Sequence, residues 1–286
     1  MREADKKVLL RVRRGMVFMK AILGLGLTAT GILLTGWEAE KYQKGQKLYA
    51  FVEASCVIRE TETETVCEDI IRTRQDPGLP ENQQKENVYE EEKPDTSQID
   101  QIDFGALQEI NPDVTAWIEI PGTKVSYPVL FRYGDTNYYL THLMDGREGK
   151  QGAIHIDGSG PDGIESQNVL IYGHNLMDSS MFSSLHSYKR ESFYRNYPYI
   201  YLHMPDGTKR QYRIAACMVT EGIETEWYRY AFEDDADAQA YYDLFQQKSL
   251  YDTKTKLDAE EGRQTILLST CYRRQCRRMI LAVRES

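Results

Sequence analysis

The chain has 286 residues, which is too long for a single compact domain of typical size and too short for three domains. Hydrophobic residues make up 41% of it, enough for one substantial core. The formal net charge of −9 is concentrated between residues 60 and 98, where 12 acidic and four basic residues occur. The remainder is close to neutral, which excludes a nucleic-acid-binding protein built on a basic face. The 20 tyrosines, together with many β-branched residues, favour a sheet-rich fold.

The first forty residues predict a membrane anchor. A basic head, residues 1–15, precedes a largely apolar run of 22 residues from Met16 to Trp37. As a helix this run would be about 33 Å long, close to the hydrocarbon thickness of one bilayer. Lys20, its only charged residue, lies near the end that the positive-inside rule places in the cytoplasm. We therefore expect a single-pass protein of the cell membrane whose remaining residues are extracellular. The alternative is a cleaved signal peptide, although no A-x-A-like site follows the run.

Residues 38–100 are predicted to form an extracytoplasmic stalk and an acidic linker. The mixed charged and apolar pattern from Glu38 to Arg59 indicates a helical continuation of the anchor. The acidic segment from Glu60 to Gln98 has three prolines and few aromatic residues, so it cannot bury enough apolar surface to order itself. It is typical of a flexible spacer, and the folded domain is expected to comprise residues 101–286.

The pattern in that domain predicts a mainly β fold. A short helix capped by Asp103 comes first and ends at Asn111. Short apolar runs then alternate with turn residues, which indicates an antiparallel barrel or sandwich. The eight predicted strands are Ala116–Ile120, Val125–Phe131, Ala153–Ile156, Val169–Tyr172, Tyr199–Met204, Gln211–Val219, Thr265–Ser269 and Met279–Val283. Helical spacing of apolar residues predicts two further helices, Ser180–Tyr188 and Asp235–Lys248.

Cys271 is a candidate nucleophile because it follows a predicted strand and precedes four arginines. Nearby cations stabilise a thiolate, which is the reactive form of cysteine. A buried, inert cysteine is the alternative interpretation from composition alone. The five cysteines are an odd number for an exported chain, so at least one thiol is expected to be free. Cys56 and Cys67 could pair with each other, and Cys217 lies in an apolar run typical of a core.

His174 is the candidate proton-transfer residue. It follows the apolar run Val169–Tyr172 and a single glycine, Gly173, which permits a sharp turn and leaves room beside the imidazole. A histidine at a strand end that faces a cleft can exchange protons with a substrate. A histidine in an ordinary surface loop is the alternative.

Arg278 stands directly before the last predicted strand. If the chain turns back after Cys271, the two strands pair antiparallel, and Arg278 and Cys271 would face each other at one end of the sheet. A guanidinium in that place can donate hydrogen bonds to a developing oxyanion. Arg277 is the alternative for this role, and a solvated basic run is the structural alternative for both.

The order of these residues resembles the sortase family, and class B sortases in particular. The likeness rests on Tyr172-Gly-His-Asn175, Leu268-Ser-Thr-Cys271 and Arg278, and it extends from about Ile102 to Val283. Further matching segments are Asn111–Thr123, Val125–Val129, Tyr138-Tyr139-Leu140 and Ser180-Met181-Phe182. Only six residues separate Cys271 from Arg278, whereas class B sortases usually have a longer connection. The short connection favours Arg278 as the catalytic arginine because of its register with the strand, and Arg277 stays open as the alternative.

This resemblance implies an eight-stranded sortase-type β-barrel with N-terminal helices and an inserted helix before the cysteine strand. The predicted helix Asp235–Lys248 fits that place. The implied activity is that of a cysteine transpeptidase, which cleaves a C-terminal sorting signal after Thr and transfers the acyl group to an amine of the cell wall or of a pilin. The implied catalytic residues are Cys271, His174 and Arg278, and Ser269 and Leu140 are the implied substrate-binding residues.

Two other functions are compatible with the same residues. A cysteine peptidase would hydrolyse the same type of signal, and a non-catalytic wall-binding module would use the arginines to bind anionic polymers. The partners expected are surface proteins that carry a sorting signal, together with the amine acceptor. The sequence contains no clustered acidic or histidine ligand set, so neither a metal nor another cofactor is expected.

Overall fold

The computed structural model describes residues 37–59, 97–221, 225–273 and 276–285. The predicted basic head, all of the predicted anchor except Trp37, and most of the acidic linker lie outside these residues. Within the described part of the chain, no helix combines the length and the apolar character that a bilayer span requires. The prediction of an anchor therefore remains a prediction.

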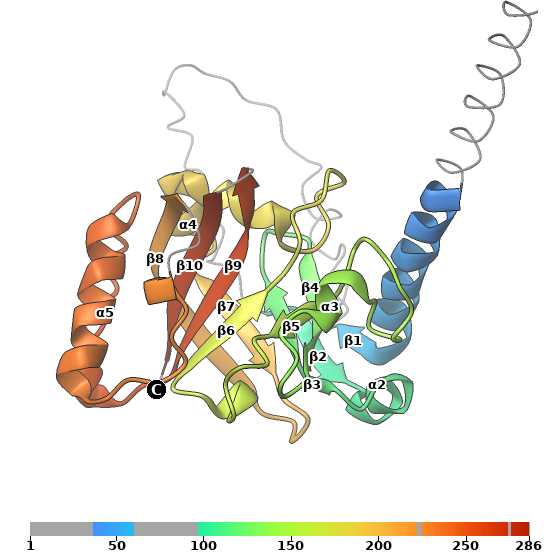
Figure 1. Cartoon of the computed structure of the whole chain (residues 1–286), viewed down its shortest axis with the longest axis horizontal. Helices are drawn as coiled ribbons and strands as arrows, with labels where there is room; N and C mark the ends of the chain where they lie inside the picture. Colours follow the sequence, from blue (N-terminus) through green and yellow to red (C-terminus); the bar gives the residue numbers. More distant parts are fainter. Residues whose placement is uncertain (1–36, 60–96, 222–224, 274–275, 286) are drawn as a thin grey trace, which may run out of the picture.

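Eight strands close into a barrel in the order β10-β8-β7-β3-β4-β5-β6-β9 (Figure 1). Their bounds are β3 Val114–Ile120, β4 Val125–Phe131, β5 Ile154–Ile156, β6 Asn168–Tyr172, β7 Tyr199–His203, β8 Lys209–Glu221, β9 Thr265–Arg273 and β10 Cys276–Arg284. The predicted eight-stranded barrel is confirmed, and each predicted strand overlaps one of these.

The expectation of a wholly antiparallel sheet is wrong, because β4 pairs with β5 and β6 pairs with β9 in parallel. Parallel neighbours need a long crossover connection between them. The chain supplies one between β4 and β5 through residues 132–153. It supplies the other between β6 and β9 through β7, β8 and the helix that follows them. No local sequence pattern reveals such a pairing.

The hydrophobic core has two parts because successive side chains of a strand point to opposite faces. On β10, Ile280 and Ala282 belong to the cluster inside the barrel. Met279 and Leu281 belong to a second cluster that α5, Asp235–Lys248, covers from outside. Figure 1 shows α5 along one side of the barrel and the N-terminal helix on the opposite side.

The helices largely follow the predictions. The helix α2, Phe104–Ile110, is capped by the Asp103 side chain, which accepts a hydrogen bond from the amide of Ala106. The helix α5 has the predicted bounds, whereas the segment predicted as a helix from Ser180 is a 3₁₀ helix, η2 Phe182–Lys189. The remaining short helices are α3 Tyr138–Thr141, α4 Glu191–Asn196, η1 Gly163–Glu165, η3 Thr225–Trp227 and η4 Ala259–Glu261.

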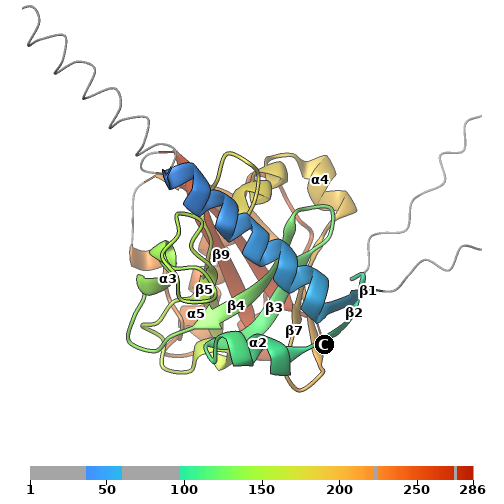
Figure 2. The ribbon, with the colours of Figure 1, turned by 90° about the vertical axis from the view of Figure 1, so that its right-hand side faces the viewer.

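Residues 37–56 form one helix, called the N-terminal helix below, that lies across the outside of the barrel near β3 and β4 (Figure 2). It leads into β1, Val57–Arg59, which pairs antiparallel with β2, Ile99–Ile102. The helical continuation predicted for residues 38–59 is thus present except for its last three residues, which form a strand.

Candidate active site

The ends of two neighbouring strands bring His174 and Cys271 together. The strands β6 and β9 pair in parallel, with Tyr172 opposite Ser269. His174 follows Tyr172 by two residues and Cys271 follows Ser269 by two, so His174 and Cys271 lie side by side. The Thr270 hydroxyl donates a hydrogen bond to the Gly173 carbonyl at 2.7 Å, which ties the two strand ends together. This register places an imidazole next to an exposed thiol although the two residues are far apart in the chain.

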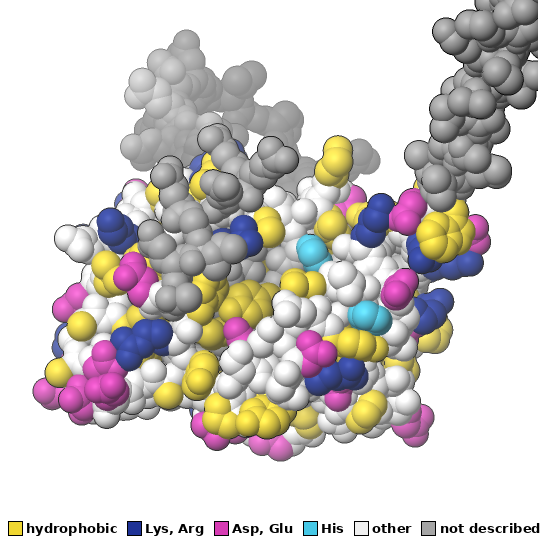
Figure 3. Space-filling view, in the orientation of Figure 1, with side chains coloured by type: hydrophobic (Ala, Val, Ile, Leu, Met, Phe, Trp, Pro, Cys, Tyr) yellow, Lys and Arg dark blue, Asp and Glu magenta, His cyan; other side chains and the backbone are white. Residues whose placement is uncertain are grey.

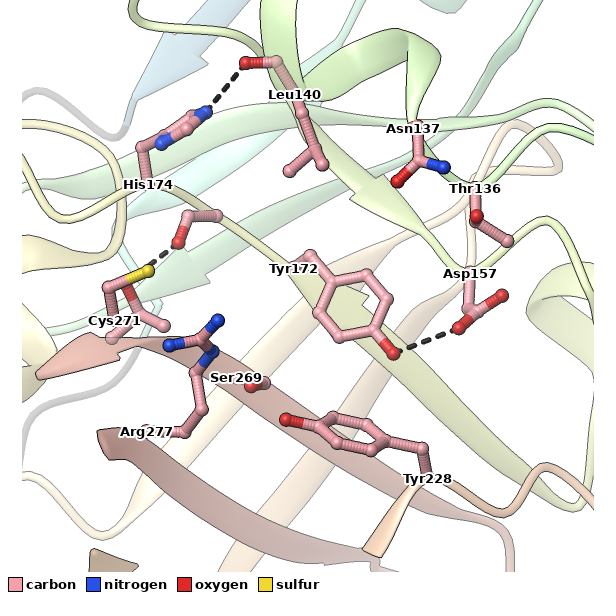
Figure 4. A pocket seen from close by; sticks show the side chains of 12 residues that line it. Thr136, Asn137, Leu140, Asp157, Tyr172, His174, Tyr228, Ser269, Cys271 and Arg277 are labelled. Atoms are coloured by element: carbon pink, nitrogen blue, oxygen red, sulfur yellow. Dashed lines mark hydrogen bonds between the residues drawn. The ribbon is translucent and has the colours of Figure 1, made fainter. Parts of the chain in front are cut away.

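A hydrogen bond and a close backbone approach fix the His174 ring. Its Nε2 lies 2.6 Å from the carbonyl oxygen of Leu140 (Figure 4). Since a carbonyl can only accept, Nε2 carries a proton, and Nδ1 is left to gain or lose one. Gly152, at φ +57°, lies beneath the ring, where an added Cβ would come within 3.0 Å of His174 Cδ2 and 2.4 Å of the Tyr139 carbonyl oxygen. Only glycine fits both this backbone conformation and this space.

Gly173 is required for close packing. An added Cβ there would lie 2.5 Å from Ile154 Cδ1 and 2.6 Å from the Phe182 ring. The amide of Phe182 also donates to the carbonyl of His174 at 3.0 Å. The space that a side chain at position 173 would need is thus filled by Ile154 and Phe182, and Gly173 is not among the residues with positive φ.

The strand register distinguishes the two candidate arginines. In the β9–β10 hairpin Arg277 lies directly opposite Cys271, whereas Arg278 lies opposite Thr270. Residues opposite each other share a face, and adjacent residues point to opposite faces. Arg277 therefore lines the same pocket as Cys271, and the prediction that Arg278 faces Cys271 is corrected by one residue. A register irregularity between Cys276 and Arg277 produces this arrangement.

Arg278 lies instead on the inner face of β10, where only 1% of its surface is exposed. Its guanidinium carbon is 5.1 Å from the centre of the Tyr272 ring, and its Nε and Nη1 atoms have no hydrogen-bond partner. Burial lowers the pKa of this guanidinium. It also lowers the pKa of the nearby His186 imidazole, which the Arg278 charge lowers further.

A pocket of about 380 Å³ extends from the thiol along β6. Both residues proposed from the resemblance to bind substrate, Ser269 and Leu140, line it. The full lining is Thr136, Asn137, Leu140, Asp157, Tyr172, Gly173, His174, Tyr228, Ser269, Thr270, Cys271 and Arg277. In the space-filling view this face has a central patch of hydrophobic side chains bordered by basic, histidine and acidic ones (Figure 3).

Sequence reasoning missed the residues at the far end of this pocket. The Tyr172 hydroxyl donates to the Asp157 carboxylate at 2.8 Å, and burial, followed by the Asp157 charge, raises the pKa of Tyr172 well above its ordinary range. Tyr228 lies with its ring centre 5.9 Å from that of Tyr172. Asp157 precedes a glycine, so the sequence pattern indicated only a turn.

The described cysteines differ sharply in environment. Cys271 is exposed, and Cys217 is fully buried, with burial raising the pKa of its thiol to about 12. Cys56 is unpaired and buried, and Cys67, its predicted partner, lies outside the described residues. Among the residues with described positions, no cluster of three or more His, Cys, Asp or Glu side chains could hold a metal ion.

Comparison with known proteins explains this arrangement. Residues 118–285, more than half of the chain, match the Sortase domain. The chain belongs to the sortase family. It is 31% identical over 169 residues to Sortase B of Staphylococcus aureus, a segment that covers 59% of this chain and 67% of that protein. The identity to Sortase B of Listeria monocytogenes is also 31%, over 58% of this chain and 65% of the relative.

Solved sortase structures share the fold. The Clostridium perfringens sortase B structure matches with a TM-score of 0.60 at 24% identity, covering 64% of this chain and all of that one. A Staphylococcus aureus sortase B–substrate complex matches with a TM-score of 0.58 at 26% identity, covering 64% and 84%. The prediction of a cysteine transpeptidase similar to sortase B, with a sortase-type barrel, is confirmed at this level.

Proposed function

We propose that this sortase cleaves a C-terminal sorting signal after a threonine and transfers the acyl group to an amine of the cell wall or of another protein. The observation that carries the proposal is the convergence of Cys271, His174 and Arg277 on one pocket from three strand ends. A thiol, an imidazole and a guanidinium at one scissile bond provide the nucleophile, the proton donor and the oxyanion donor for acyl transfer.

In the first step the Cys271 thiolate attacks the threonine carbonyl carbon, and a C–S bond forms. Arg277, opposite Cys271 in the hairpin, donates hydrogen bonds to the oxygen that becomes negatively charged. Collapse of this intermediate breaks the C–N bond, and protonated His174 gives its Nδ1 proton to the leaving amine. A thioester on Cys271 remains.

In the second step an acceptor amine attacks the thioester carbonyl. His174 takes up the proton that the amine loses, the C–S bond breaks, and the thiolate returns. The bond from His174 Nε2 to the Leu140 carbonyl keeps the ring in one orientation through both steps, since neither protonation of Nδ1 nor its loss disturbs it. Arg277 thus has the role that the sequence pattern assigned first to Arg278.

The solved relatives support both halves of the reaction. One Staphylococcus aureus sortase B structure is a substrate complex, and another similar sortase B structure is complexed with triglycine, a peptide with a free amine. By similarity, the partners proposed here are surface proteins that carry a sorting signal and an amine of the cell wall or a pilin. The proposal also includes tethering to the cell membrane through residues 16–37, with the barrel outside.

Mass spectrometry of the products from peptides of the form x-x-x-Thr-x, with and without triglycine, tests the proposal. We expect a product cleaved after Thr and joined to triglycine.

Cys271→Ala should abolish the covalent enzyme adduct, and Cys276→Ala, a matched change at the other thiol of the hairpin, should retain it. His174→Ala should lower kcat/KM by about 100- to 10,000-fold, the usual contribution of an acid–base group.

The same experiment separates the rival functions. A product that carries water in place of triglycine at every acceptor concentration would identify a hydrolytic peptidase. Peptide or polymer binding that survives Cys271→Ala without any cleavage by the unaltered protein would identify a binding module, and the transpeptidase proposal would then be wrong.

A further inference from the structure

The far end of the active-site pocket carries a fixed negative charge. Of the described residues that line the pocket, Asp157 is the one carboxylate. Its Oδ1 accepts a hydrogen bond from the Ser159 amide at 2.8 Å, and its Oδ2 accepts one from the Tyr172 hydroxyl at 2.8 Å. Two donors from different segments hold the carboxylate in one orientation, while its remaining lone pairs are free to accept further hydrogen bonds.

The residues beside this carboxylate suit a cation. Tyr172 and Tyr228 both line the pocket, with ring planes inclined at 51° to each other. Aromatic faces next to a carboxylate attract an ammonium or guanidinium group through cation–π interaction as well as through charge. Figure 4 shows Tyr172 between Asp157 and the end of the pocket that holds Cys271 and His174.

The strand register gives the distance of this charge from the thiol. The Asp157 amide donates to the Leu170 carbonyl on β6, whereas Cys271 lies level with His174, four residues further along that strand. Four residues correspond to about 13 Å at the usual rise of a strand. The Asp157 side chain reaches back to Tyr172, so an extended peptide with its threonine at Cys271 meets the carboxylate three or four residues away from that threonine.

We infer that a bound peptide runs upstream from Cys271 towards Asp157, and that Asp157, Tyr172 and Tyr228 form a subsite for a lysine or arginine side chain three or four residues upstream of the cleaved threonine. The inference rests on the proposed function, because it assumes a peptide substrate in this pocket. Arg277 at the other end repels such a side chain, so the pocket also sets the direction in which a basic peptide binds.

Peptides that differ only at these two upstream positions test the subsite. With Lys, Gln or Glu at either position, we expect kcat/KM of the unaltered enzyme to fall in that order, by about tenfold between Lys and Gln. The preference should weaken as salt is added, because it depends on charge at a solvent-accessible site.

The decisive variant is Asp157→Asn. Asparagine can accept from the Ser159 amide through Oδ1, and its Nδ2 can donate to the Tyr172 hydroxyl, so the pocket keeps its shape. We expect it to cleave the Lys and Gln peptides equally. Asp162→Asn is the matched control, because it removes the same charge from an exposed carboxylate that does not line the pocket, and it should keep the preference.

The outcomes distinguish this inference from the proposed function. Cleavage of all three peptides at equal rates by the unaltered enzyme, or a lysine preference that persists in Asp157→Asn, would overturn the subsite and leave the transpeptidase intact. A complete lack of cleavage and of covalent adduct with every peptide would overturn the proposed function and the subsite with it.

Discussion

Adjacent arginines on β10 have opposite environments. Arg277 lines the pocket opposite Cys271, and Arg278 is buried with two nitrogen atoms unpaired. Among the described residues no carboxylate pairs with Arg278, and such a buried guanidinium is costly to the folded state. A guanidinium beside a scissile carbonyl instead contributes to the transition state. The reaction rate is therefore expected to depend on Arg277, and the stability of the fold on Arg278.

Substitution of each arginine tests this division. Arg277→Gln should lower kcat/KM by about 100- to 1,000-fold, the usual loss for one oxyanion donor, with an unchanged Tm. Arg278→Met should keep kcat/KM within about threefold and leave the Tm equal or higher, because a flexible apolar side chain replaces a desolvated charge. Peptide cleavage and thermal unfolding measure both. The reverse pattern would assign the oxyanion role to Arg278.

The sequence was sufficient to predict that Cys271 and His174 follow strands, and the structure places both in one pocket, because each apolar run ends there. The choice between the two arginines depended on a one-residue irregularity in the hairpin, which no sequence pattern encodes. Gly152 and Asp157 act through contacts with residues distant in the chain, so their roles became visible only in three dimensions.

At the scale of elements, the N-terminal helix contacts both loops that support His174. Tyr42 and Gln46 each donate a hydrogen bond of 2.6 Å to the Asp178 carboxylate, in the loop directly after His174. Tyr49 donates one of 2.6 Å to the carbonyl of Gly152, beneath the imidazole. The helix is therefore expected to act as a positioning element for His174, the proposed proton-transfer residue.

The double variant Tyr42→Phe/Gln46→Leu should lower kcat by roughly tenfold with little change in KM, because small displacements of a catalytic group are costly. Lys44→Ala, on the same helix and in an exposed pair with Glu40, is the matched control and should have no effect. Steady-state kinetics of purified, folded variants measure this. An unchanged kcat in the double variant would show that the helix does not position His174.

These contacts also predict a dependence on pH. Burial alone would raise the pKa of Asp178, but hydrogen bonds from Ser180 and Tyr42, with a further one from Gln46, hold it at about 2, below the ordinary 3.8. A lowered carboxyl pKa stabilises the fold fully above the ordinary value, and this contribution is lost as the pH falls towards 2. Asp178→Asn should thus lower the Tm at pH 6, and its difference from the unaltered protein should shrink near pH 2. A constant difference in calorimetry would contradict this.

Local signals account for the elements that were predicted. The helix α5 has an aspartate cap, Asp234, and apolar residues at helical spacing, and its bounds agree with the prediction. The β1–β2 pair was missed, because its partners lie on either side of the acidic segment and neither is strongly apolar. The parallel pairings were missed because pairing direction depends on the path of the whole chain.

At the scale of the molecule, the predicted anchor and the active-site pocket are expected to act independently. The predicted anchor ends at Trp37, and every described residue that lines the pocket lies beyond it in the sequence. Deletion of residues 1–36 should therefore release the protein from membranes and leave kcat/KM for a soluble peptide unchanged. The full chain should sediment with membranes and resist extraction by salt or alkali, as an apolar span of this length does. Release of the full chain by salt alone would contradict the anchor.

The parallel seam between β6 and β9 also determines when the enzyme becomes competent. The thiol gains its imidazole neighbour only after the last two strands have inserted between β6 and β8, which closes a contact between residues about a hundred positions apart. Such distant contacts are late and slow to form during folding. A chain still emerging from the ribosome, or one truncated before residue 265, has no assembled active site. Incomplete copies are therefore expected to have no peptide-cleaving activity towards neighbouring proteins.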